Sequence, residues 1–231
     1  MMLSNILLQI TSEADTIAES AAEGEAKLSI LELLSKGGLV MIPIFIMAVA
    51  AIYLFVERYL TIKKAADTDS DFMNNIREMV VNGDIEGAQQ LCRDNPSPIA
   101  RMIEKGIARI GRPLKDISAS IENAGSLEIY KLEKNLASLG TIAGVAPMIG
   151  FLGTVTGMIR AFYNLSMAGN NIDPGMLAGG IYEAMITTAS GLAVGIVAYV
   201  GYNYLSTLIG KVIFKMEATT VGFIDLLEEP A

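Results

Sequence analysis

The sequence contains no histidine and only one cysteine, Cys92. Without histidine, the chain cannot form a histidine proton shuttle or a histidine-ligated metal site. A single cysteine excludes an internal disulfide framework, and we expect Cys92 to be a buried, idle thiol in a cytoplasmic segment. The sequence also offers no nucleophile beside a base, no phosphate-binding loop and no cluster of metal ligands. We therefore expect no enzymatic activity, no metal and no cofactor.

Basic residues are also scarce. The chain has 17 Lys and Arg against 25 Asp and Glu, which gives a net charge of -8. No segment forms a basic stripe, so we expect no nucleic-acid partner. The first ten residues lack a positively charged start and make a poor signal peptide.

Apolar residues are abundant and gathered into blocks. They make up 52% of the chain, and the mean hydropathy is +0.46. Three runs carry no charge, namely Gly37 to Val56, Asn135 to Ile159 and Ala184 to Gly210. Each reaches the roughly 20 residues that cross about 30 Å of hydrocarbon. The sequence therefore predicts an all-α, polytopic membrane protein with three transmembrane helices, two of them extended into a cytoplasmic helical bundle.

The predicted segments follow one another without overlap. They are a periplasmic tail (1–27), an interfacial helix (28–36), the first span (37–59), a cytoplasmic helical domain (60–134), the second span (135–164), a periplasmic loop (165–175), the third span (176–210) and a cytoplasmic C-terminal helix (211–231). The interfacial helix could equally be an extension of the first span.

Charge at the ends of the spans predicts the orientation of the chain. Arg58, Lys63 and Lys64 cluster at the C-terminal end of the first span, and Lys211 and Lys215 follow the third. Because basic residues accumulate on the cytoplasmic side, we expect a periplasmic N-terminus and a cytoplasmic C-terminus.

Turn signals divide residues 61–134 into four helices. Asn82-Gly83 ends the first, Asp84 caps the second, and the pair Pro96 and Pro98 breaks the chain before the third. The fourth begins near Pro113 and is predicted to run into the second span without a break. One chain covers such projecting helices poorly, so we expect an oligomer with a helical collar.

Hydroxyl groups interrupt the second and third spans. Thr154 and Thr188 are predicted at similar depth, near the middle of the membrane, with Thr187 beside the latter. We interpret Thr154 and Thr188 as part of an ion pathway, and Thr187 as a further candidate. The alternative is that each threonine only satisfies its hydroxyl on a backbone carbonyl and helps the helices pack.

Two charged residues lie nearer the outer side. An acid inside a membrane costs about 3 kcal/mol unless it is paired, protonated or facing water, which makes Glu183 a third candidate for the pathway. Arg160 lies at the same predicted level in the second span. The two side chains either pair or reach the outer interface separately.

Small residues favour close packing of these spans. Gly153 and Gly157 in the second span and Gly191 and Gly195 in the third are each four residues apart. Pro147 removes a helical hydrogen bond and is predicted to bend or loosen the second span.

Proton transfer needs a group that titrates, and the predicted midplane offers only hydroxyls. If these residues form a proton path, the titrating carboxylate must come from another chain.

Two motifs resemble the ExbB/TolQ/MotA family of proton-channel proteins, and most of all its ExbB/TolQ branch. They are APMIGFLGTVTG (146–157) and GIYEAMITTASGL (180–192), supported by GGLVMIPI (37–44) and ERYL (57–60). Relatives often carry a proline after the second motif, where this chain has GIVA (195–198), and a neutral residue or histidine where it has Arg160.

The resemblance implies a pentamer around a pore that holds a dimeric, single-span partner similar to ExbD or TolR. The partner's aspartate would be the missing acid, and proton flow would energise a TonB-like protein that spans the periplasm. The implied location is the inner membrane of a Gram-negative bacterium. A TolQ-like role in envelope maintenance, a flagellar stator subunit, which usually has four spans, and a non-conducting membrane scaffold remain the alternatives.

Overall fold

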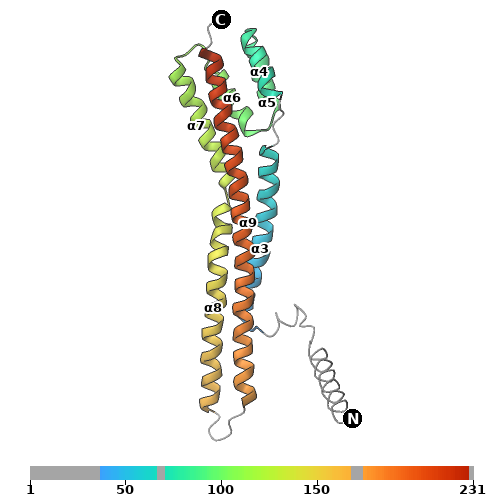
Figure 1. The fold of residues 1–231 in the computed structure, drawn as a ribbon, viewed down its shortest axis with the longest axis vertical. Coiled ribbons are helices and arrows are strands. Elements are labelled where there is room, and N and C mark those ends of the chain that lie inside the picture. Colours follow the sequence, from blue (N-terminus) through green and yellow to red (C-terminus); the bar gives the residue numbers. More distant parts are fainter. Residues whose placement is uncertain (1–36, 67–70, 168–173, 229–231) are drawn as a thin grey trace, which may run out of the picture. The chain divides into compact units, whose positions relative to one another are not determined.

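The computed structural model describes residues 37–66, 71–167 and 174–228, and all regular structure in these ranges is helical. Figure 1 shows the helices α3 (Met41–Ala66), α4 (Phe72–Val81), α5 (Ile85–Asp94), α6 (Pro98–Ile107), α7 (Leu114–Glu133), α8 (Leu136–Met167) and α9 (Pro174–Glu228). The predicted all-α fold class is confirmed. The predicted N-terminal tail (1–27), the interfacial helix (28–36) and most of the loop at 165–175 lie outside the described residues.

The described residues form two compact units. The first contains residues 37–41, 153–167 and 174–187, and the second contains 42–66, 71–152 and 188–228. Helices α8 and α9 each contribute one part to each unit.

Three helical stretches are long and apolar enough to cross a membrane, as the charge-free runs predict. They are Met41–Ala66, Leu114–Met167 and Leu177–Glu228. The 55 residues of α9 correspond to roughly 80 Å at 1.5 Å per residue, far more than a bilayer needs. The prediction that the third span continues past Lys211 is therefore confirmed.

The caps of the short helices follow the turn signals in the sequence. The Asp84 side chain accepts a hydrogen bond from the backbone N–H of Gly87 at 2.9 Å, at the start of α5. Gly83, just before it, has a φ of 76°, a left-handed conformation that glycine adopts without strain. The Ser97 hydroxyl caps α6 by accepting from Ala100 N–H at 3.2 Å. Pro96 and Pro98 alone predicted this boundary, and the Ser97 cap adds to it.

The junction between α7 and α8 corrects one prediction. The predicted fourth helix does not run unbroken into the second span, because α7 ends at Glu133 and α8 begins at Leu136. Asn135, between them, has a φ of 64°, and asparagine tolerates this left-handed conformation better than most residues.

Arg58 of α3 stabilises this break. It is only 6% exposed, and its guanidinium donates to the Lys131 carbonyl at 3.3 Å and to the Glu57 carboxylate beside it. The last carbonyl groups of a helix have no partner inside the helix, so Arg58 caps the end of α7. A contact from a distant helix thus fixes a break that the local sequence does not reveal.

The core of the second unit draws buried side chains from every helix from α3 to α9, and Figure 1 shows α6 and α7 beside the C-terminal part of α9. Ile76, Ile121, Leu205 and Phe223 are completely buried there. Each side chain of this size contributes about 1.5–3 kcal/mol when it is removed from water. The apolar faces of α4 to α7 explain why this part of the chain folds against the long helix.

Glu128 ties α6 to α7 within the same unit. Its carboxylate is 5% exposed and accepts from Arg101 Nη2 at 2.6 Å and from Lys131 Nζ at 2.7 Å. A buried acid is tolerated when both oxygens have charged donors.

We predict that Cys92 is inert in the folded protein. The thiol is 1% exposed, and burial, aided by the negative charge of Glu104, raises its pKa from 9.0 to about 12. At neutral pH the thiolate fraction is then about a thousandfold lower than in an unfolded chain. N-ethylmaleimide should label the native protein at least a hundredfold more slowly than the denatured protein. Equal labelling rates would show that Cys92 is accessible.

Candidate functional site

Thr154 lies at the contact between α8 and α9 in the first unit. It is half-buried, and its hydroxyl donates to the carbonyl of Ala184 on the facing helix at 3.2 Å. Glycine makes this approach possible: a Cβ added at Gly157 would lie 2.9 Å from the Cβ of Ala184. A donating hydroxyl keeps two lone pairs, so Thr154 can still accept a hydrogen bond from water.

The carbonyl of Ala184 is shared by two threonines. The hydroxyl of Thr187, which is 2% exposed, donates to the same oxygen at 2.7 Å, and Thr187 also lies against Gly153. Thr187 is therefore buried in the helix contact, whereas Thr154 is partly open. Sequence reasoning missed Ala184, because a backbone acceptor has no sequence signature.

Thr188 makes the equivalent bond in the second unit. It is half-buried, and its hydroxyl donates to the carbonyl of Gly150 on α8 at 3.1 Å. Gly191, three residues further along, approaches the same part of α8: a Cβ there would lie 2.6 Å from the Ala146 carbonyl oxygen and 2.9 Å from the Cα of Gly150. The predicted packing glycine thus sits directly beside the predicted pathway threonine.

Pro147 takes part in the same contact. A Cβ added at Gly195 would lie 2.8 Å from Cδ of Pro147 and 3.1 Å from the carbonyl oxygen of Ala143. Helix α8 continues through Pro147. The proline ring therefore fills the space that Gly195 leaves open on α9.

Arg160 and Glu183 lie near each other in the first unit. Nη1 of Arg160 is 3.7 Å from Oε1 of Glu183, with the two side chains 66% and 34% exposed. An exposed pair at this distance contributes little in water, but lipid around it would strengthen the attraction. The arrangement places two opposite charges next to each other on facing apolar helices.

Gly38 is a second residue that sequence reasoning gave no role. Its φ of 65° is left-handed, and a Cβ there would collide with the Glu183 carboxylate. Gly38 thereby lets the chain before α3 pass directly over the acid. The motif GGLVMIPI, which contains Gly38, indicated that this position matters. The sequence could not show that Glu183 is the residue that Gly38 contacts.

The described ranges contain no group of three or more Cys, Asp or Glu side chains placed to bind a metal. In the two α8–α9 contacts described above, one in each unit, the polar groups are hydroxyls, backbone carbonyls and one Arg–Glu pair. These groups can hold water and pass protons along hydrogen bonds, and Glu183 is the carboxylate among them.

The sequence profile of the MotA/TolQ/ExbB proton channel family matches residues 94–218, which is more than half of the chain. This range includes both motifs and the threonines described above.

Individual relatives agree with the profile. The chain is 28% identical to a putative biopolymer transport protein ExbB homologue of Methanothermobacter thermautotrophicus, over 82% of this chain and 67% of the relative. It is 26% identical to the biopolymer transport protein exbB1 of Vibrio cholerae, over 86% and 88%. A shorter match, 39% identical over 43% of each chain, is to the Tol-Pal system protein TolQ of Haemophilus influenzae.

We predict that Gly38→Ala displaces Glu183. The methyl group would occupy the position of the carboxylate. The alanine backbone would also have to adopt a left-handed φ, which is strained for any residue with a Cβ. The melting temperature in detergent should therefore fall by several degrees. Gly179→Ala is the matched control, because nothing lies within 4 Å of a Cβ there. Combining Gly38→Ala with Glu183→Ala should restore part of the loss. A Gly38→Ala protein as stable as the wild type would contradict the contact.

We also predict that Gly191→Ala separates α8 from α9. The added methyl group meets backbone atoms, which cannot rotate away, so we expect a loss of about 2 kcal/mol or more. Gly210→Ala on the same helix has open space and should be neutral or stabilising by up to about 1 kcal/mol. Thermal unfolding of both variants tests this, and equal melting temperatures would refute it.

Proposed function

Because this chain belongs to the MotA/TolQ/ExbB proton channel family, we propose that it is the channel subunit of an inner-membrane motor driven by the proton motive force. In this proposal it acts with an ExbD-like partner to energise a TonB-like protein for outer-membrane transport. The ExbB names of two relatives that align with most of the chain support this branch of the family.

The observation that carries the proposal is the presence of half-buried hydroxyls inside apolar helices. Thr154 and Thr188 each donate to a carbonyl of the facing helix, which fixes the orientation of the hydroxyl and leaves its lone pairs available. A fixed acceptor can orient water along a narrow path. We propose that Thr154, Thr188 and Glu183 line this path, with Thr187 and Arg160 adjusting its geometry and charge.

The proposed partner supplies what this chain lacks. A proton that moves between water and the membrane centre needs a carboxylate with a suitable pKa, and the threonines cannot supply one. A single-span protein with a membrane-embedded aspartate would provide it. We propose a pentamer of this chain around two such helices, with the exposed apolar faces of α3, α8 and α9 meeting neighbouring subunits, the partner helices and membrane lipid.

The orientation and energetics follow from the same proposal. The basic residues at the C-terminal end of α3 and the lysines in α9 would face the cytoplasm, with the N-terminus in the periplasm. Each proton that crosses releases about 2.3 kcal/mol per 100 mV, so several protons must be coupled to one mechanical cycle.

A second candidate is a TolQ-like role in envelope maintenance, which the match to the Haemophilus influenzae TolQ protein favours. A non-conducting scaffold is a third, because each threonine hydroxyl makes the bond that helix packing alone would require.

Proton flux in vesicles, with the partner co-expressed, separates a channel from a scaffold. We expect Thr154→Val, Thr188→Val and Glu183→Gln each to reduce flux about tenfold or more, since one hydrogen bond to the moving proton is worth about 1.4 kcal/mol. Thr219→Val is the control, because this threonine donates to the Lys215 carbonyl of its own helix, beyond the charge-free run.

The amount of assembled complex must be equal in all samples. If both Glu183→Gln and Glu183→Ala conduct as the wild type does, Glu183 has no part in transport. If the two threonine variants also conduct normally, the path lies elsewhere.

A further inference from the structure

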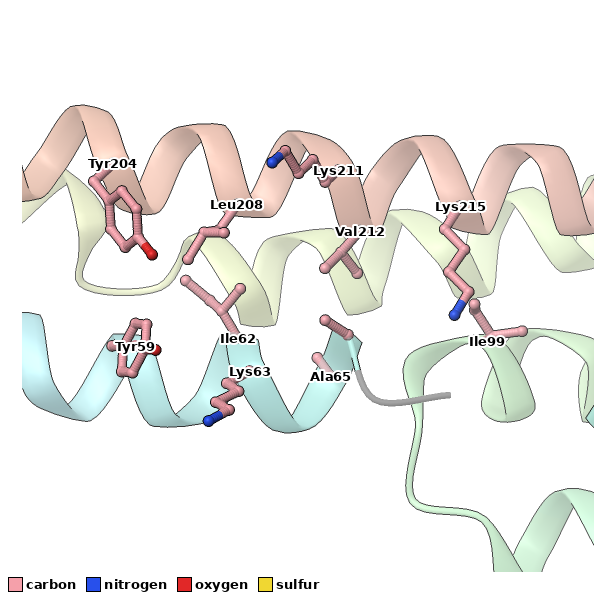
Figure 2. Close-up of a pocket in the computed structure, with 11 residues that line it drawn as sticks. Tyr59, Ile62, Lys63, Ala65, Ile99, Tyr204, Leu208, Lys211, Val212 and Lys215 are labelled. Carbon is pink, nitrogen blue, oxygen red and sulfur yellow. The ribbon is translucent and has the colours of Figure 1, made fainter. Parts of the chain in front are cut away.

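A groove lies between α3, α6 and α9 in the second unit, outside the residues assigned to the ion path. Its volume is about 280 Å³, and Figure 2 shows α3 and α9 forming its two sides, with Tyr59 and Tyr204 at one end and Ile99 of α6 at the other. Ile62, Leu208 and Val212 contribute apolar side chains to its lining.

Three lysines line this groove, and no acid does. Lys63 comes from α3, and Lys211 and Lys215 come from α9. Among the described residues, neither Lys63 nor Lys211 forms an ion pair with a carboxylate. Their flexible side chains are exposed and can reach a negative group held in the groove. The excess positive charge points to an anionic ligand.

A second, almost entirely apolar slot continues the groove along the same two helices. Its volume is about 330 Å³, and it shares Tyr204 with the lysine-lined groove. Phe55 of α3 and Val197, Val200 and Gly201 of α9 form its lining. On α9, residues 197, 201, 204, 208, 211 and 215 are spaced by three or four, so they share one helix face. The two cavities therefore follow one seam between α3 and α9.

The charge pattern sets the depth of each cavity in a membrane. Every residue that lines the apolar slot belongs to a charge-free run. Most lie in the runs Gly37 to Val56 and Ala184 to Gly210, and Leu139 of α8 lies in the run Asn135 to Ile159. The lysine-lined groove extends across the ends of the runs on α3 and α9, from Tyr59 and Tyr204 to the lysines beyond them. The slot thus lies at the level of the acyl chains and the groove at the level of the headgroups.

We propose that this seam binds one anionic phospholipid, with an acyl chain in the apolar slot and its phosphate near Lys63, Lys211 and Lys215. A soluble anion would use only the lysines and would leave the apolar slot empty. A neutral lipid would fill the slot but gain nothing from the positive charge. Only an amphiphile with a negative headgroup matches both cavities, so the site would couple the seam between α3 and α9 to the lipid composition of the membrane.

Native mass spectrometry of the delipidated full-length protein tests the proposal. Phosphatidylglycerol and phosphatidylcholine with identical acyl chains would be titrated separately, and inorganic phosphate would be added as a competitor. We expect tighter binding of phosphatidylglycerol, with no displacement by millimolar phosphate. The variant Lys63→Gln/Lys211→Gln should lose about fivefold in affinity for each lysine removed, with no change for phosphatidylcholine.

Two further variants complete the test. Lys105→Gln/Lys115→Gln removes the same charge from exposed lysines that do not line the groove, and it should bind phosphatidylglycerol as the wild type does. Val200→Phe narrows the slot at an exposed position and should weaken binding of both lipids. The proposal is overturned if the groove-lysine variant keeps full affinity, if both lipids bind equally well, or if phosphate displaces the lipid.

Discussion

The close approach of two helix backbones at Gly191 is the constraint on which the membrane part of this protein depends. A Cβ there would meet the Ala146 carbonyl oxygen and the Cα of Gly150, so even alanine is too large. In lipid, helices gain no hydrophobic energy by associating, and close packing with interhelical hydrogen bonds must hold them together. The small residues bring α9 near enough for the Thr188 hydroxyl to reach the Gly150 carbonyl.

The same chemistry serves packing and, in our proposal, conduction. A threonine that donates to a facing carbonyl stabilises the contact, and its remaining lone pairs have a fixed direction. Thr187 has its hydroxyl buried, whereas Thr154 bonds to the same carbonyl from a half-buried position. Position in the contact, and not residue type, therefore distinguishes a packing threonine from a candidate pathway threonine.

Outside the proposed path, α3 organises the region where the apolar spans give way to charged helices. Arg58 caps the end of α7, while Lys63 lies one turn further along and lines the groove against α9. The helix therefore contacts both α7 and α9 in the second unit. A lipid held along this seam would contact α3 and α9 together, which gives the membrane a direct means of influencing how firmly they pack.

The sequence by itself determined the number of apolar helices, the turn at Gly83, the Asp84 cap and the small and polar residues of α8 and α9, because spacing, charge and backbone preference are local properties. It did not reveal the break at Asn135, since Arg58, which is 73 residues from Lys131, stabilises it. Nor could it show that Ala184 accepts two hydroxyls or that Gly38 covers Glu183. These features arise only when distant helices meet. Every residue has a backbone carbonyl, and the identity of a glycine does not show which residue packs against it. The tertiary structure alone decided them.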